Sequence, residues 1–215
     1  VRFVTDPPSI DFVDRIAQVY LDNDTMIGPV LRYLLTSADF AGSVGQKLRT
    51  PQEDIYAQLR AIGIGRPTGG EELRQLYWAL SQTGHAPLNW APPNGFPDTP
   101  AHWATPTTAL ARLSLHMDIS GGWWPQLTGY PKNAAGTKSL GGLLPSPLPP
   151  THGALVQAMG QRLLFGPLPD QVRDAVLGFF GATAGTPLTA SSQIVGWQLP
   201  YLVALLFDSP AHTVR

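Results

Sequence analysis

The residues of this chain that could bind a metal ion lie between Asp98 and Asp118. Asp98 and His102 are four residues apart, and His116 follows one expected helix further on, beside Asp118. Two imidazoles and two carboxylates are ligands for a hard or borderline metal ion. Asp98 stands between two prolines, however, so a helical face shared with His102 is not expected, and no His-Glu-x-x-His motif is present. We therefore predict no metal site. Asp98, His102 and His116 are the ligand candidates if one exists. The favoured alternative is that Asp98 caps a turn and the histidines lie on the surface.

Arg112 is the charged side chain best placed to hold two segments together. It lies about two turns into a helix expected to start at Thr105-Pro106, directly after a proline- and aromatic-rich loop. Its guanidinium could clamp loop carbonyls or Asp98, or it could bind the carboxylate of a ligand. Because most side-chain hydrogen bonds go to backbone or water, the sequence favours the structural clamp.

Aromatic side chains concentrate in two irregular stretches, 84–104 and 120–150. Flat rings on loops suit stacking on sugar rings, prolines or the apolar patch of a partner. They also fill gaps where proline-rich chain cannot pack regularly, and we favour this second interpretation because aromatic rings are mostly buried. The candidate ligand-binding residues are Trp90, Phe96, Trp103, Arg112, Trp123 and Trp124.

Other chemistries have no support in the sequence. The glycine-rich stretch 63–69 follows a helix rather than a strand and departs from the phosphate-loop spacing. No Gly-x-Ser-x-Gly motif marks a nucleophilic serine. Cysteine is absent, which excludes disulfides, zinc–thiolate sites and thiol catalysis. We expect no cofactor.

Charge and composition exclude several partners. The net charge is −1 and no Lys/Arg cluster occurs, so neither nucleic acid nor an anionic membrane is an expected partner. Charged residues are 13% of the chain, against about 25% in typical soluble domains. The longest apolar run, 199–207, contains a proline and falls far short of the ~20 residues that span a bilayer.

Helical periodicity dominates, and no run alternates convincingly with period two. Thr50-Pro51-Gln52-Glu53 is a capping box with proline at the first helical position, and Gly63 is placed to end that helix. Pro200 is expected to kink or restart the last helix. The expected helices start near Ser9, Pro29, Thr50, Glu71, Thr105, Thr151, Asp170 and Ser192. This pattern predicts an all-α fold, an irregular multi-helix domain of seven to nine helices joined by long Pro/Gly-rich loops.

We expect one helical domain over residues 1–215, with 120–150 as a long mobile loop. That stretch holds six glycines and six prolines and therefore offers few helical hydrogen bonds. Structureless loops beyond about 12–15 residues are uncommon in compact domains.

A set of spaced motifs carries a family resemblance. The motifs are Pro51 with Glu53, Leu80 with Gln82, Gly95-Phe96-Pro97, Trp103 with Pro106, and Leu110-Ala111-Arg112. They resemble the C-terminal part of the large uncharacterised bacterial family catalogued as domain of unknown function eighteen hundred. Phe96 stands where that family has tryptophan. The resemblance implies a helical, exported bacterial protein, of which this chain is the C-terminal part, and it implies no particular chemistry.

Two functions are consistent with these patterns. The first is a binding or scaffolding module of an exported protein, periplasmic or extracellular, whose partners are a glycan or a protein together with the N-terminal part of the same protein. The second is part of a hydrolytic or metal-assisted enzyme whose other catalytic groups lie upstream of residue 1. Convergence of Asp98, His102, His116 and Arg112 in a deep pocket favours the enzyme, whereas a shallow aromatic groove favours the binding module.

Overall fold

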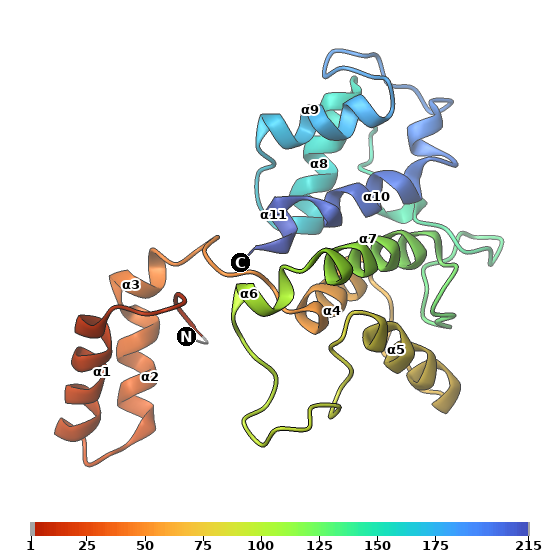
Figure 1. Cartoon of the computed structure of the whole chain (residues 1–215). Helices are drawn as coiled ribbons and strands as arrows, with labels where there is room; N and C mark the ends of the chain where they lie inside the picture. Colours follow the sequence, from red (N-terminus) through yellow and green to blue (C-terminus); the bar gives the residue numbers. More distant parts are fainter. Residues whose placement is uncertain (1–2, 215) are drawn as a thin grey trace.

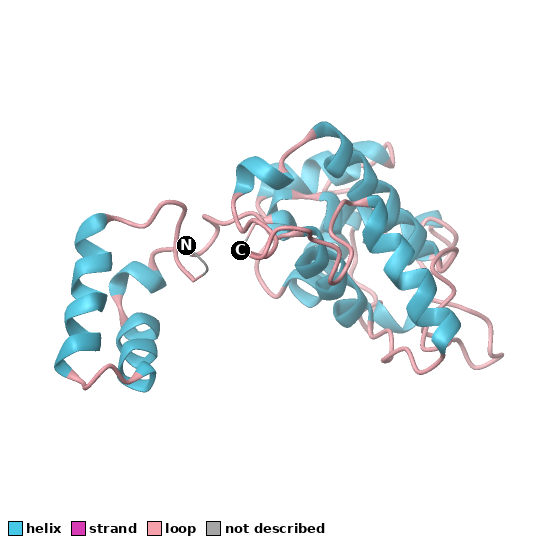
Figure 2. Cartoon of the chain, turned by 60° about the horizontal axis from the view of Figure 1, so that its bottom comes forward, coloured by secondary structure: helices cyan, strands magenta, loops and turns pink. Residues whose placement is uncertain are grey.

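The computed structural model describes residues 3–214, and across that range the chain is helical without a β-strand (Figure 2). This confirms the all-α prediction. Eleven α-helices are present among these residues, eight of ten residues or more and three of a single turn. The single-turn helices, which carry too few residues for a periodic pattern, account for the excess over the expected seven to nine.

An N-terminal hairpin stands away from the rest of the molecule (Figure 1). It consists of α1 (Ile10–Asp22), α2 (Ile27–Thr36) and the short α3 (Ala38–Ala41). Lys47, which follows it, is buried and binds Asp6 Oδ2 at 2.7 Å and Asp98 Oδ2 at 3.3 Å. This lysine therefore ties the segment before the hairpin to the 84–104 loop of the main body.

The main body is built around α7 (Pro106–Gly121). On one side α7 packs against α10 (Leu199–Asp208), which continues into α11 (Pro210–Thr213). On the other side lie α4 (Pro51–Ile62) and α5 (Gly70–Gln82), as Figure 1 shows. The layer beyond α10 is α8 (His152–Leu164) with α9 (Asp170–Phe179), and α6 (Pro100–Trp103) precedes α7. The core they share includes Ile55, Leu80, Leu115, Leu155, Leu202 and Phe207.

The helix ends follow the capping signals in the sequence. Thr50 and Glu53 form the expected capping box, and the Thr50 N–H donates to Glu53 Oε2 at 3.1 Å. Gly63 ends α4 with φ of 84°, a left-handed conformation that glycine adopts without steric cost. Pro200 restarts the chain as expected, because α10 begins at Leu199 after a short 3-10 helix, η2 (Gln193–Val195).

The segment 120–150, which we expected to be a mobile loop, contributes directly to the core. Its first two residues finish α7, and it includes a 3-10 helix, η1 (Gly141–Leu143). Leu127, Tyr130 and Leu140 are buried in the main apolar cluster. The Tyr130 hydroxyl also donates to the Ser120 carbonyl at 2.6 Å. Apolar side chains of this segment thus pack in the core, and its mobility stays a prediction.

Among the described residues, no helix has both the length and the apolar character needed to cross a bilayer.

Candidate functional site

Three of the candidate aromatic residues pack together in the 84–104 loop. Trp103 is 3% exposed, and its indole N–H donates to the Pro97 carbonyl at 2.7 Å. His85 stacks on it, with ring centroids 4.6 Å apart and planes 19° from parallel. Phe96 lies against His85, and Trp90 against Phe96. The loop is therefore folded around Trp103, which is the gap-filling role.

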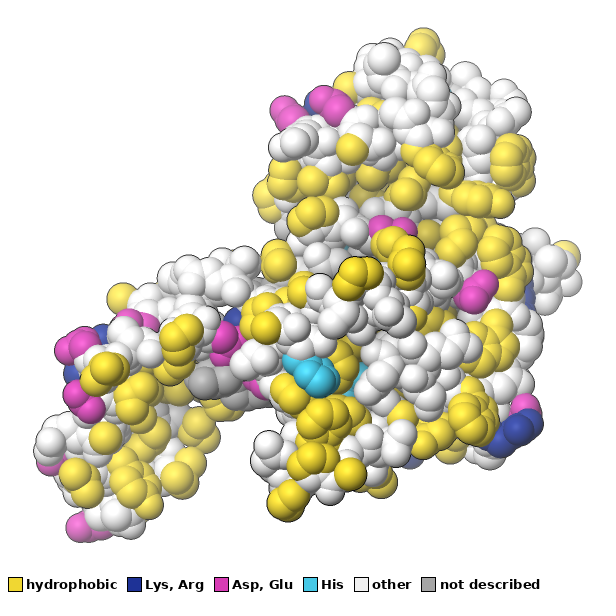
Figure 3. All heavy atoms as spheres, in the orientation of Figure 1, with side chains coloured by type: hydrophobic (Ala, Val, Ile, Leu, Met, Phe, Trp, Pro, Cys, Tyr) yellow, Lys and Arg dark blue, Asp and Glu magenta, His cyan; other side chains and the backbone are white. Residues whose placement is uncertain are grey.

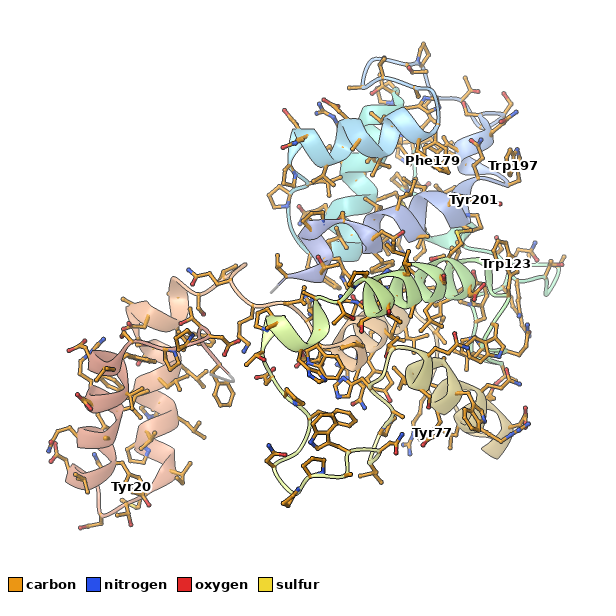
Figure 4. The ribbon with its side chains drawn as sticks, in the orientation of Figure 1. Tyr20, Tyr77, Trp123, Phe179, Trp197 and Tyr201 are labelled. Carbon is orange, nitrogen blue, oxygen red and sulfur yellow. The ribbon has the colours of Figure 1, made fainter. Side chains whose placement is uncertain are left out.

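Trp123, which Figure 4 labels, and Trp124 lie elsewhere, just beyond the C-terminal end of α7. The Trp123 side chain is half exposed, and Trp124 is partly buried against the core. The candidate aromatic residues therefore do not form a single surface.

A separate group of exposed aromatic rings was not among our candidates. Phe179 of α9 and Tyr201 of α10 are nearly parallel, with centroids 6.5 Å apart, and Trp197 meets Tyr201 edge-on (Figure 4). Phe179 and Trp197 are largely exposed. These rings form a surface patch.

Arg112 is a clamp, but its partner is Asp54 rather than Asp98. Arg112 Nε donates to Asp54 Oδ2 at 2.6 Å, and both side chains are buried. Arg112 Nη1 also donates to the Arg49 carbonyl at 3.4 Å. The guanidinium thus joins α7 to α4 and to the chain before it. Arg112 Nη2 is buried without a hydrogen-bond partner among the described residues.

His116, one turn further along α7, lies between two carboxylates. Its Nε2 is 3.0 Å from Asp54 Oδ2, and its Nδ1 is 2.7 Å from Asp208 Oδ1 at the end of α10. His212 of α11 approaches the same aspartate, with Nε2 2.7 Å from Asp54 Oδ1. This last contact is short enough for an ion pair, but within residues 3–214 neither of its two atoms makes a hydrogen bond of acceptable geometry. We call Asp54, Arg112, His116, Asp208 and His212 the Asp54 cluster.

The charges of the Asp54 cluster follow from burial and from one another. Burial alone lowers the pKa of His116, but Asp54 and Asp208 outweigh it and raise that pKa to about 9. Burial raises the pKa of Asp54, but the neighbouring His116 and Arg112 outweigh it and hold that pKa well below its usual value. Burial lowers the pKa of His212 and raises that of Asp208. With both aspartates ionised, Arg112 and a protonated His116 balance them.

The structure does not gather the three metal candidates. Asp98 binds Lys47, and His102 packs its ring edge-on against Trp103 and Trp90. Only His116 belongs to a group that could hold an ion, together with Asp54 and His212. The converging site of Asp98, His102, His116 and Arg112 is therefore absent from the described part of the chain.

Cavities border both α4 and α7. A cavity of about 300 Å³ opens beside His116 and Asp208, and its wall includes Trp103, Leu113 and Arg112. The second cavity, about 740 Å³, lies along the outer face of α4.

The larger cavity has an apolar floor and basic edges. The floor includes Leu59, Ile64, Leu76 and Leu127, the last supplied by the 120–150 segment. Its charged and hydroxyl-bearing lining residues are Arg49, Glu53, Tyr56, Arg60 and Arg66. We call this cavity the Arg60–Arg66 groove.

Arg60 and Arg66 carry positive charges that no described residue neutralises. Arg60 and Arg66 are exposed, and the described residues offer neither of them a hydrogen-bond or ion-pair partner. Glu53 accepts the Thr50 N–H, and Arg49 donates to the His212 carbonyl at 2.7 Å. The groove therefore presents two guanidinium groups to solvent and to any ligand.

Sequence reasoning missed Asp54, Asp208, His212, Arg60 and Arg66. One signal for Asp54 was available. Asp54 and Gln58 are four residues apart on the same face of α4 as the buried Ile55 and Ile62. Polar side chains on an apolar helical face require partners.

The fold and cavities describe an all-helical domain with a ligand-sized groove and a buried ion-pair cluster. The chain matches the family described as "Protein of unknown function (DUF1800)" over residues 1–214, and it belongs to that family. No curated protein and no solved structure matches it.

Proposed function

We propose that this chain is a binding module that takes an amphipathic anion in the Arg60–Arg66 groove. The ligand class is a small molecule with an apolar body and one carboxylate or phosphate group. The observation that carries the proposal is that Arg60 and Arg66 line the cavity beside its apolar floor, and that the described residues give neither guanidinium an ion-pair partner.

Size and lining support a small molecule. A volume of about 740 Å³ lies within the range of ~300–1,000 Å³ that ligand pockets occupy. Apolar walls with a few polar groups at fixed places are typical of such pockets. Guanidinium groups bind carboxylates and phosphates through two parallel N–H donors, which fixes the orientation of the anion.

The same residues favour binding over catalysis. Burial raises the pKa of Tyr56, which keeps its phenol protonated as a hydrogen-bond donor. The Glu53 carboxylate is committed to the N-terminus of α4. A general base must reach the proton that it removes, and among the described lining residues no histidine or unengaged carboxylate is present.

Position in the cell and partners rest on the family resemblance. We propose that the module belongs to an exported bacterial protein and that the N-terminal part of the same protein is one of its partners. An antibody against the chain should detect it in the periplasmic or secreted fraction of the producing bacterium. Detection in the cytoplasmic fraction alone would contradict export.

Chemical-shift titration with octanoate, octyl phosphate and octan-1-ol tests the groove. Both anions should shift the amide signals of 57–66 and of Leu127, and the alcohol should bind at least tenfold more weakly. Arg60→Gln combined with Arg66→Gln should weaken anion binding at least tenfold, since a hydrogen bond to a charged group contributes about 1.5–3 kcal/mol.

The matched control is Arg32→Gln combined with Arg74→Gln, which removes two positive charges outside the groove. This control should bind the anions as the parent does. Equal binding of octanol and octanoate, or equal weakening by the control, would refute the proposal.

A further inference from the structure

We propose that the Asp54 cluster is a binding site for one divalent transition-metal ion, with Zn²⁺ as the best-suited ion, held by Asp54, His116 and His212. This site is separate from the Arg60–Arg66 groove and does not depend on the groove's ligand.

The first observation is the convergence of donor atoms. One oxygen of Asp54 and one ring nitrogen each of His116 and His212 all lie within 4.8 Å of one another. An ion bound at about 2.1 Å from each donor separates those donors by about 3–4 Å. All three side chains are buried, which limits their movement, and shifts of about 1 Å bring the donors to the spacing that an ion requires.

The second observation is a pair of unsatisfied atoms. Asp54 Oδ1 and His212 Nε2 are only 2.7 Å apart, yet within the described chain neither makes a hydrogen bond. The two atoms are at ion-pair distance, but the contact does not have the geometry of a hydrogen bond, so neither atom is fully satisfied. An ion that accepts a lone pair from both atoms gives each of them a partner, and the two atoms then move slightly apart.

The third observation concerns the hydrogen bonds that orient these ligands. Histidine ligands almost always donate their second ring N–H to a carboxylate, a backbone carbonyl or water, which fixes the ring. His116 Nδ1 makes such a contact with Asp208 Oδ1 at 2.7 Å. Arg112 holds Asp54 through Oδ2, which leaves Oδ1 for the ion. A cavity of about 300 Å³ reaches the cluster at His116 and Asp208.

Donor type selects the ion. Two imidazole nitrogens with one carboxylate suit zinc or another borderline ion, whereas magnesium and calcium prefer oxygen ligands alone. Binding exchanges one proton, because the Nε2 proton of His116 leaves to solvent and its lone pair binds the ion. The total charge of the cluster rises by one, since Arg112 remains in place.

The test uses the untagged protein, freed of metal with a chelator and titrated with ZnSO₄ by calorimetry. We expect one zinc ion per chain. His212→Gln and Asp54→Asn should each weaken binding at least tenfold. His102→Gln and His152→Gln remove histidines outside the cluster and should leave affinity unchanged.

A readout on the parent protein guards against variants that fail to fold. The chain contains five histidines, and zinc should shift the ring ¹⁵N signals of His116 and His212 only. The proposal is overturned if zinc does not bind at one ion per chain, if His212→Gln binds zinc like the parent, or if the shifts occur at His85, His102 or His152. Any of those results would identify the cluster as an ion-pair network alone.

Discussion

The Gly65 N–H donates to the Gly129 carbonyl at 3.1 Å, and the two backbones touch without an intervening side chain. A Cβ on Gly129 would lie 2.7 Å from Gly65 N, a distance that cannot be relieved by rotating a side chain. This contact holds the 120–150 segment against the loop after α4, where Leu127 and Ile64 form part of the groove floor.

Gly129→Ala should therefore destabilise the protein by about 1–3 kcal/mol, as overpacking does elsewhere. It should also weaken octanoate binding, because the groove floor must shift. Urea unfolding measures the first effect. Gly142→Ala is the control from the same segment, since its Cβ would meet no atom within 4 Å. Equal stability of both variants would show that the close approach of Gly129 to Gly65 does not affect the free energy of unfolding.

Arg112→Met should reduce the free energy of unfolding by about 3 kcal/mol, the lower end of the cost of breaking a buried ion pair. The lower end applies because His116 still contacts Asp54 after the change. Arg74→Met provides the comparison, since its ion pair with Glu71 is exposed and such pairs contribute about 0–1 kcal/mol. Denaturant titration in the presence of a chelator gives both values. A loss at Arg112 no larger than at Arg74 would contradict the clamp.

Trp103→Ala should cost about 3–5 kcal/mol, as truncation of a buried aromatic side chain does. Trp103 is 3% exposed and holds the 84–104 loop through Pro97, whereas Trp123 is 51% exposed. Trp123→Ala should therefore change stability by no more than about 0.5 kcal/mol. Thermal melting of the two variants distinguishes them. A near-parent melting temperature for Trp103→Ala would move this tryptophan from a structural to a ligand-binding role.

The ionised carboxylate of Glu72 should stabilise the folded protein, and this stabilisation should be lost in acid. Hydrogen bonds from Thr128, then from the Thr68 and Gly69 N–H groups, lower the pKa of Glu72 to about 2. Since the folded pKa lies below the unfolded value of 4.5, the stabilisation is complete above pH 4.5 and is lost as pH falls toward 2.

The corresponding measurement is the melting temperature of the parent and of Glu72→Gln between pH 7 and pH 2. The difference between the two proteins should be constant above about pH 5 and should shrink below it. A difference that stays constant down to pH 2 would show that the ionised carboxylate is not what holds Thr128.

Local signals in the sequence were enough for the helices but not for the site. The capping box at Thr50 and the helix end at Gly63 depend on residues a few positions apart, and both are present in the structure. Asp54 and His116 are 62 positions apart and meet only because α4 packs on α7. His212 lies in a single-turn helix, which has no periodicity to detect. The 63–69 stretch follows α4, as expected, and nothing in the sequence indicated that its Arg66 lies beside Arg60 in one cavity.

The N-terminal hairpin should open locally more readily than the main body. Across its three helices Phe12 is the only buried residue, while Ile10, Leu21 and Ile27 are at least 60% exposed. Figure 3 shows hydrophobic side chains on the surface of this hairpin. A unit with so few buried apolar contacts opens at a lower free energy than the global unfolding reaction. Its amide hydrogens should therefore exchange with solvent long before those of α7 and α10, in a local opening that leaves the groove and the Asp54 cluster closed.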